Sequence, residues 1–317
     1  SCQRSSYVLP AMYEGTQAPN QTATPTNCLR NQVAVVAGAP QGIRAIMAHA
    51  LSEAGATVLV TDVQDTAKAV KAITDAGGTA QGMTVDVTNN DDLASMVEKA
   101  KSMGGLDIMV NNASIFATLK PKPFFEISDE EFDTIMRVNA RGVHQVMRAI
   151  VPTMIGAGGG KVINIASGTF YYGPPGLSHY TASKGAVIAL TRCHGRELGD
   201  KNIQVNAIAP GLTESEGLRG NAAFDMARAP TVASRSIKRE MVPEDLLGTL
   251  IAATDDAGSG MDDQQLRDES VTLFLAGHDD PVTQYIYEKR VTVIEIIAAS
   301  NRKSKRLNTS HREHWKK

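Results

Sequence analysis

The sequence predicts an α/β fold, a doubly wound parallel sheet with helices on both faces. The first observation is that apolar runs of strand length alternate with helical patterns from residue 33 to residue 208. The second is that a glycine-rich turn follows the first apolar run and an acidic residue ends the second. The 317 residues, 42% apolar and 21% charged, suffice for one large domain plus extra segments.

Residues 1–28 precede this alternation and are rich in Gln, Thr, Pro, Ser and Asn. They have no periodicity and no apolar core of a signal peptide, so we expect a disordered segment. The main domain is expected over 29–251, with an atypical C-terminal extension over 252–317. No apolar run approaches the ~18 residues of a spanning helix, so no membrane partner is expected.

The charge and the cysteines restrict the partners and the location of the chain. A net charge of −2 gives no indication of a nucleic-acid or anionic-membrane partner. The three cysteines stand far apart and form neither a disulfide framework nor a metal-ligand spacing. We therefore expect no metal and a cytoplasmic location.

The first four elements form one pattern. Residues 33–37 are a buried-strand run, residues 38–44 a turn into a helix, and residues 57–61 a second strand that ends at Asp62. Asp62 lies twenty residues beyond Gly42, as a dinucleotide-binding βαβ unit requires. The glycines let the backbone approach a pyrophosphate at the helix N-terminus, and the carboxylate accepts hydrogen bonds from the ribose hydroxyls. Because a carboxylate repels a 2′-phosphate, the expected cofactor is NAD rather than NADP.

The alternation then continues along the chain. Short apolar runs bounded by turn residues predict strands, and longer amphipathic segments predict helices. The predicted helices cover 64–76, 91–102 and a long segment from 129, and the predicted strands cover 80–85, 106–110, 161–167 and 203–208.

A tyrosine and a lysine stand four residues apart in the next predicted helix, which follows two prolines and a glycine at 174–176. On a helix this spacing puts Tyr180 and Lys184 on one face, so the ammonium can favour the ionised phenol. A tyrosine whose free pKa is about 10 then becomes a usable proton donor and acceptor near neutral pH. Ser167 precedes Tyr180 by thirteen residues, at the end of an apolar strand.

Together these residues resemble the active site of the classical short-chain dehydrogenases/reductases, such as 3-oxoacyl-carrier-protein reductases, over roughly residues 30 to 251. The resemblance implies hydride transfer between NAD(H) and the carbon of a secondary alcohol or ketone. It implies that Tyr180 exchanges the proton, Lys184 holds the nicotinamide ribose, Ser167 hydrogen-bonds the substrate oxygen and Asn139 holds a relay water. It also implies a homo-oligomer, a dimer or a tetramer.

The resemblance further implies a set of cofactor-binding residues. Asp86 and Val87 resemble the adenine contact, and Asn112 and Ala113 belong to a segment beside the cofactor. Residues 210–213 resemble the segment that cradles the nicotinamide end. The implied set is Gly38, Gln41, Gly42, Ile43, Asp62, Asp86, Val87, Asn112, Ala113, Tyr180, Lys184, Pro210, Gly211 and Thr213.

Three residues depart from the family pattern: Ala37 replaces a threonine, and Arg44 and Ser114 each replace a glycine. The arginine must displace a neighbour in a close helix-to-strand contact or reach toward the pyrophosphate. We expect the strain of this close contact to outweigh any hydrogen bond from Arg44 to the pyrophosphate. Arg44→Gly should therefore tighten NADH binding in a fluorescence titration. Weaker binding by the variant would instead identify Arg44 as a cofactor ligand.

Three further sets of residues are interpreted from the sequence. Residues 214–241 lie where the family has a mobile substrate lid. The aromatic residues 170–172 either wall an apolar pocket or fill the core. We interpret His179 and His194 as polar helix residues, because no acid or cysteine stands at ligand spacing from them.

Beyond residue 251 the resemblance ends. Residues 260–279 resemble the oxygen-activating helix of haem-thiolate mono-oxygenases, but Asp280 replaces the usual threonine and no later cysteine could ligate iron, so no haem is expected. This ending and Arg44 leave open a catalytically silent NAD-binding or regulatory protein. A fusion with an oxygenase fragment is a further alternative, against which the missing cysteine argues.

Overall fold

One parallel sheet organises the chain in the computed structural model, which describes residues 29–38, 43–213, 225, 228–229 and 272–275. Within these residues the strand order is β3-β2-β1-β4-β5-β6-β7, and every neighbouring pair is parallel. The order reverses between β1 and β4, which makes the sheet doubly wound and confirms the predicted fold class. The strands are β1 Val33–Ala37, β2 Thr57–Asp62, β3 Thr79–Thr84, β4 Ile108–Asn111, β5 Gly160–Ile165, β6 Ile203–Pro210 and β7 Thr272–Leu275.

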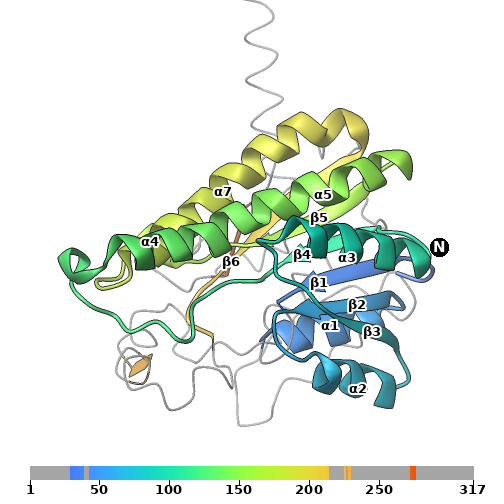
Figure 1. Cartoon of the computed structure of the whole chain (residues 1–317), viewed down its shortest axis with the longest axis horizontal. Helices are drawn as coiled ribbons and strands as arrows, with labels where there is room; N and C mark the ends of the chain where they lie inside the picture. The colour runs from blue at the N-terminus through green and yellow to red at the C-terminus, as the bar shows by residue number, and fades with distance from the viewer. Residues whose placement is uncertain (1–28, 39–42, 214–224, 226–227, 230–271, 276–317) are drawn as a thin grey trace, which may run out of the picture.

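Helices cover both faces of the sheet (Figure 1). Side chains of β1 alternate: Val36 packs in the cluster of α1 and α2, and Val35 packs in the cluster of α3 and α5. Both residues are fully buried, as the continuous apolar run predicts for a central parallel strand. The helices are α1 Ile43–Glu53, α2 Ala67–Asp75, α3 Asn90–Ser102, α5 Gly142–Gly156 and α7 Ser178–Leu198.

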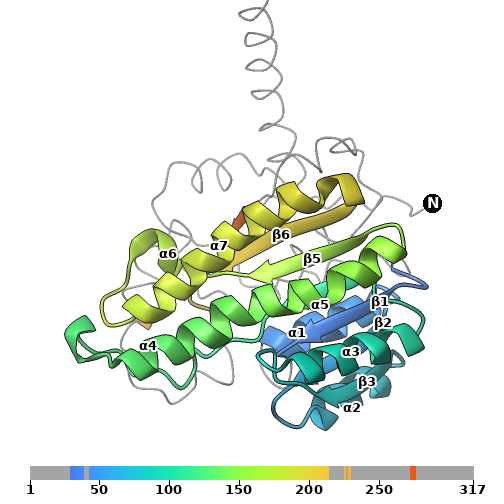
Figure 2. The same cartoon turned by 45° about the horizontal axis from the view of Figure 1, so that its top comes forward.

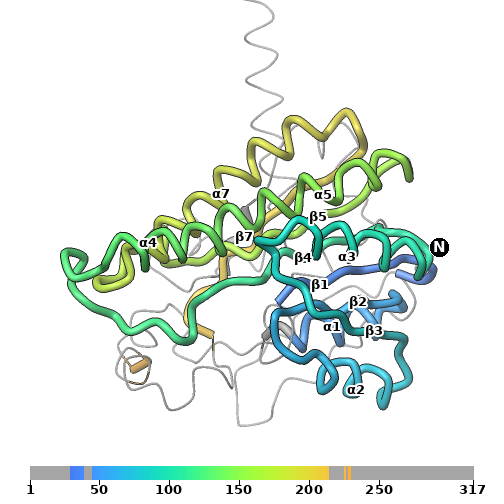
Figure 3. Tube along the Cα trace, in the orientation of Figure 1, coloured from blue at the N-terminus to red at the C-terminus, as the bar shows by residue number. Residues whose placement is uncertain are grey.

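The long helix predicted from residue 129 consists of three consecutive segments, α4 Asp129–Met136, the π-helical turn η2 Arg137–Arg141 and α5. Figure 3 shows them as one continuous path. Ser128 caps the helix, since its Oγ accepts a hydrogen bond from the Glu131 N–H at 3.2 Å. A π turn inside an α-helix is frequent at functional sites, and this one carries Asn139.

Three shorter helical turns complete the described elements: η1 Phe124–Glu126, α6 Thr169–Tyr172 and η3 Gly199–Lys201. Figure 2 shows α6 beside α7. The three aromatic residues of α6 are 41% to 47% exposed, so the alternative in which they fill the core is wrong. Phe170 instead covers Gly185 of α7, where a methyl group would lie 2.8 Å from Cδ2 of Phe170.

Strand β7 differs from the pattern noted in the sequence. It lies inside the stretch 260–279 that resembles a helix, yet it pairs in parallel with β6. The open edge of β6 offers unpaired backbone groups, and the composition Thr-Leu-Phe-Leu favours a strand. Residues 1–28, most of the predicted lid, and the extension other than β7 lie outside the described residues, so the predicted domain boundaries stay predictions.

Candidate active site

Tyr180 and Lys184 lie on the same face of α7, beside the carboxyl end of β5. Both are buried, with exposed fractions of 5% and 3%. The Lys184 ammonium donates a hydrogen bond to the backbone carbonyl of Ile165 at 2.7 Å and lies 5.9 Å from the centroid of the Tyr180 ring. The last residue of β5 therefore holds the Lys184 cation near the Tyr180 ring.

The Tyr180 ring is held by the loop that follows β4. The ring of Phe116 lies against it, with centroids 4.6 Å apart and planes tilted by 33°. Leu119, Ile135 and Leu177 complete the apolar cluster around Tyr180. The sequence gives no sign of this contact, because Phe116 lies more than sixty residues before Tyr180.

Ser167 lies just beyond β5, with 7% of its surface exposed. Its Oγ accepts hydrogen bonds from the N–H and the hydroxyl of Thr169, at 3.3 and 3.1 Å. The next residue, Gly168, donates its N–H to the carbonyl of Pro210 at 2.8 Å. The segment expected at the nicotinamide end therefore begins next to Ser167, and it continues through Gly211 to Thr213, whose hydroxyl bonds the Gly211 carbonyl.

Asn139 is fully buried in the π turn, and its side chain joins two other elements. Its Oδ1 accepts from the Ile115 N–H at 2.8 Å, and its Nδ2 donates to the Ile115 carbonyl at 3.2 Å. A third hydrogen bond runs from Nδ2 to Oγ of Ser183 at 3.2 Å. The amide thus ties the loop after β4 to the turn of α7 that carries Ser183.

Gly38 ends β1 at a point where no side chain fits. Its φ is +81°, and a methyl group there would lie 2.5 Å from Cα of Ala113. The Gly38 N–H donates to the Thr61 carbonyl at 2.7 Å, and its carbonyl accepts from Nδ2 of Asn112 at 2.9 Å. The ends of β1, β2 and β4 consequently meet at this glycine, because a residue without a side chain lets Ala113 pack this closely.

Both acids predicted for the cofactor site accept a hydrogen bond from the backbone two residues further along the chain. Asp62 ends β2 with 8% exposed, and its Oδ1 accepts from the Gln64 N–H at 2.8 Å. Oδ1 of Asp86 accepts from both the N–H and the hydroxyl of Thr88 at 2.8 Å, so this carboxylate shapes the turn before α3. Val87 packs on α5, where a methyl group at Gly142 would lie 2.9 Å from it.

Part of the predicted cofactor turn lies outside the described residues. Gln41 and Gly42, and the side chains of Ile43 and Arg44, lie outside the described residues, so their predicted roles stay predictions. In the part of the chain that is described, no three His, Cys, Asp or Glu side chains gather into a possible metal site. The same residues contain no helix long and apolar enough to cross a membrane.

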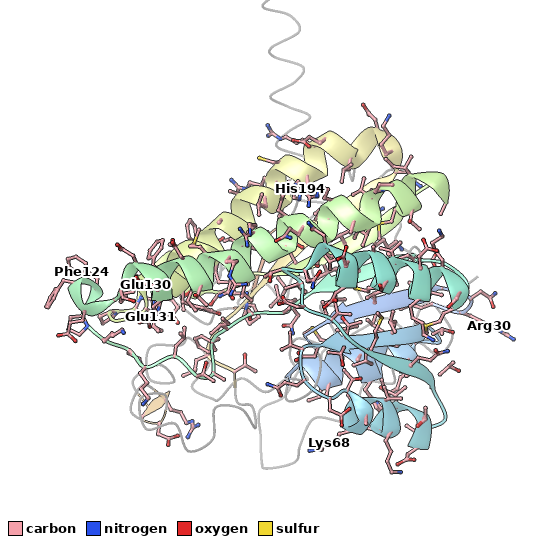
Figure 4. The ribbon with its side chains drawn as sticks, viewed as in Figure 1. Arg30, Lys68, Phe124, Glu130, Glu131 and His194 are labelled. Carbon is pink, nitrogen blue, oxygen red and sulfur yellow. The ribbon has the colours of Figure 1, made fainter. Side chains whose placement is uncertain are left out.

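His179 has an acidic partner that spacing along the chain did not reveal. Its imidazole is fully buried, and Nε2 lies 3.3 Å from Oε1 of Glu131. Figure 4 labels Glu131 on α4. Lys122 also hydrogen-bonds Glu131. The spacing along the chain missed this acid because Glu131 comes from a different helix.

The Glu131 carboxylate should make stability depend on pH. The hydrogen bond from Lys122 lowers the pKa of Glu131 below its ordinary value of 4.5. The folded chain therefore favours the ionised carboxylate more than the unfolded chain does. The resulting stabilisation is fully present when the pH is above the ordinary pKa, and it is lost as the pH falls through the lowered pKa of the folded state. Glu131→Gln should lower Tm at pH 7 and approach the wild-type Tm near pH 3.

Melting curves from pH 7 to pH 3 test this expectation. Glu98→Gln, which breaks the exposed pair with Lys101 on α3, is the matched control, and exposed pairs contribute little. A Glu131→Gln curve that runs parallel to the wild-type curve over the whole range would contradict the assignment.

Comparisons with known proteins agree with this geometry. A family model described as short chain dehydrogenase matches residues 32–224. The chain is 33% identical over 190 residues to 3-oxoacyl-[acyl-carrier-protein] reductase of Thermotoga maritima, a match covering 59% of this chain and 76% of that protein. It is 30% identical over 225 residues to 2-dehydro-3-deoxy-D-gluconate 5-dehydrogenase of Escherichia coli, covering 70% and 88%.

A solved structure shows the same fold. The crystal structure of a 3-oxoacyl (acyl-carrier-protein) reductase from Agrobacterium tumefaciens C58 with NADP bound matches with a TM-score of 0.69 and 26% identity. That match covers 79% of this chain and 95% of the other. The family model spans every residue of the candidate site described above.

Proposed function

Because the chain belongs to the short-chain dehydrogenase family, a family of oxidoreductases, we propose that it transfers a hydride between NAD(H) and the carbon of a secondary alcohol or ketone. The observation that carries the proposal is the arrangement around α7. All four polar residues, Tyr180, Lys184, Ser167 and Asn139, are buried. Ser167 follows β5 by two residues and Lys184 bonds the Ile165 carbonyl at the end of β5. Asn139 and Tyr180 contact Ile115 and Phe116 in the segment after β4. A polar set of this kind is costly to bury unless it has partners.

The proposed roles follow from the contacts. In the direction of reduction, the Tyr180 phenol gives its proton to the substrate oxygen while the carbonyl carbon receives the hydride. Lys184, fixed by the Ile165 carbonyl, favours the phenolate that remains. Ser167 donates to the substrate oxygen, and Asn139 holds the relay through which Tyr180 recovers its proton. Bound NADH supplies the hydride, and the protein supplies orientation and proton transfer.

The residues at the ends of β1 and β2 fit a dinucleotide. Gly38 directly follows β1 and has no side chain, and Asp62 lies one strand away, since Ala37 and Thr61 are paired in the sheet. Gly38 would face the pyrophosphate and Asp62 the adenosine ribose hydroxyls. Asp86, Val87, Asn112, Ala113 and residues 210–213 would complete the site toward the adenine and the nicotinamide.

We expect NADH to be preferred over NADPH, because the Asp62 carboxylate bonds ribose hydroxyls and repels a 2′-phosphate. The ratio of kcat/KM values should be roughly tenfold or more, which corresponds to about 1.4 kcal/mol of differential binding. Asp62→Ser should reduce that ratio mainly by improving NADPH, and direct binding of both dinucleotides can be measured by fluorescence without a substrate. Equal or better efficiency with NADPH in the wild type would contradict the expectation.

The reaction itself is tested by following NADH oxidation against a panel of ketones that includes 3-oxoacyl thioesters and aryl ketones. Turnover of one class supports the proposal and names the substrate. NADH binding without turnover of any class would favour the silent cofactor-binding alternative.

We also propose that the protein is cytoplasmic and forms a homo-oligomer, either a dimer or a tetramer. Light scattering would measure the mass of this assembly in solution.

A further inference from the structure

Ser183 connects two residues of the candidate active site. Its side chain is fully buried on α7, between Tyr180 and Lys184 in the sequence. Oγ accepts a hydrogen bond from Nδ2 of Asn139 at 3.2 Å and donates one to the carbonyl oxygen of Tyr180 at 2.7 Å. A serine hydroxyl has one proton to donate, so these two bonds fix its orientation.

The first of these bonds holds the Asn139 amide in place. Asn139 has no exposed surface, and its other partners are the N–H and the carbonyl of Ile115. Without Oγ of Ser183, the Nδ2 group keeps a single acceptor, the Ile115 carbonyl. A buried amide that lacks a partner is costly and tends to reorient, and reorientation of Asn139 would release the Ile115 backbone.

The segment that Asn139 holds also contacts Tyr180, the proposed proton donor. Ile115 precedes Phe116, and the ring of Phe116 lies 4.6 Å from that of Tyr180. The contacts therefore run from Ser183 through Asn139, Ile115 and Phe116 to the Tyr180 ring, and the hydrogen bond from Ser183 to the Tyr180 carbonyl joins the two ends.

We propose that Ser183 is a positioning residue of this site, which acts through Asn139 to hold the segment after β4 against Tyr180. The proposal rests on the function proposed above, because it assigns Asn139 and Tyr180 their roles in proton transfer. Removal of the hydroxyl should slow proton transfer far more than it weakens cofactor binding, since the hydrogen bonds of Ser183 go to Asn139 and to the Tyr180 backbone and not to Gly38 or Asp62.

The chain contains a matched control on the same helix. Thr191 is fully buried two turns along α7, and its hydroxyl donates to the Val187 carbonyl at 2.7 Å. It accepts from Nδ2 of a second buried asparagine, Asn164, at 2.9 Å. This pair has the same chemistry as the pair of Ser183 and Asn139, but it joins α7 to Asn164 of β5, and Thr191 lies eleven residues beyond Tyr180 on the helix.

The first measurement compares kinetics. Ser183→Ala should lower kcat roughly tenfold, the size expected when one orienting hydrogen bond is lost. The NADH dissociation constant should change much less than kcat, and the pH profile of kcat should be displaced. Thr191→Val removes the equivalent hydroxyl and should lower Tm without either kinetic change. Equal kinetic losses in the two variants would show a general structural role and overturn the proposal.

A double-mutant cycle tests the route through Asn139. In an Asn139→Ala background, Ser183→Ala should cost nothing further, because its effect on kcat is transmitted by that amide. Additive losses would overturn the proposal. If Ser183→Ala does not fold, Ser183→Cys replaces it, since a thiol of similar size is only a weak hydrogen-bonding group.

A third readout requires no turnover, so it separates this inference from the proposed reaction. The Ile115 N–H donates to Asn139, and its hydrogen exchange should be faster in Ser183→Ala by roughly tenfold or more if that segment is released. Thr191→Val should leave this exchange at the wild-type rate. Unchanged exchange in Ser183→Ala would overturn the positioning role, whereas a wild-type protein that turns over no ketone would count only against the proposed function.

Discussion

Tyr180→Phe is expected to abolish turnover while the protein still binds NADH nearly as well as the wild type. The variant keeps the ring that packs against Phe116 and loses only the hydroxyl to which we assign the proton exchange. General acid catalysis contributes about 10²–10⁴ in rate, so kcat should fall by at least that lower factor. Steady-state kinetics with the best ketone of the panel and a fluorescence titration with NADH measure the two quantities.

Tyr171→Phe is the matched control for this substitution. It removes the same hydroxyl from a ring on α6 that is 45% exposed, and surface changes of this kind typically stay within about 0.5 kcal/mol. A Tyr180→Phe enzyme that kept more than roughly a tenth of the wild-type kcat, far more than loss of a general acid allows, would show that another group donates the proton.

Gly38→Ala should both destabilise the fold and weaken cofactor binding. A non-glycine residue at a φ of +81° costs about 1–2 kcal/mol. The added methyl would also lie 2.5 Å from Cα of Ala113, and overpacking typically costs a further ~1–3 kcal/mol. Because Ala113 must move away from the predicted pyrophosphate turn, we expect NADH binding to weaken as well.

Gly77→Ala separates the two costs. Gly77 has a φ of +86°, but nothing lies within 4 Å of an added methyl group. Gly77→Ala should therefore lose only the stability that a non-glycine residue costs at a positive φ, and it should bind NADH like the wild type. Chemical denaturation and NADH titration of both variants measure the difference, and equal losses of stability would mean that the contact with Ala113 relaxes freely.

The order of elements and most of the candidate site could be predicted from local patterns. Buried runs such as 33–37 mark central strands because a parallel strand covered on both faces must be apolar throughout. The spacing of Tyr180 and Lys184 needs only the helical period, and the acid at position 62 needs only the length of a βαβ unit. These properties depend on neighbours in sequence, so the chain alone determines them.

What only the tertiary structure decided are contacts between residues remote in the chain. Phe116 on Tyr180, Glu131 beside His179, and the amide of Asn139 between Ile115 and Ser183 join segments at least ten residues apart. A sequence pattern records which face of its own helix or strand a residue occupies. It does not record which other element covers that face, because packing of the whole sheet and its helices fixes that choice.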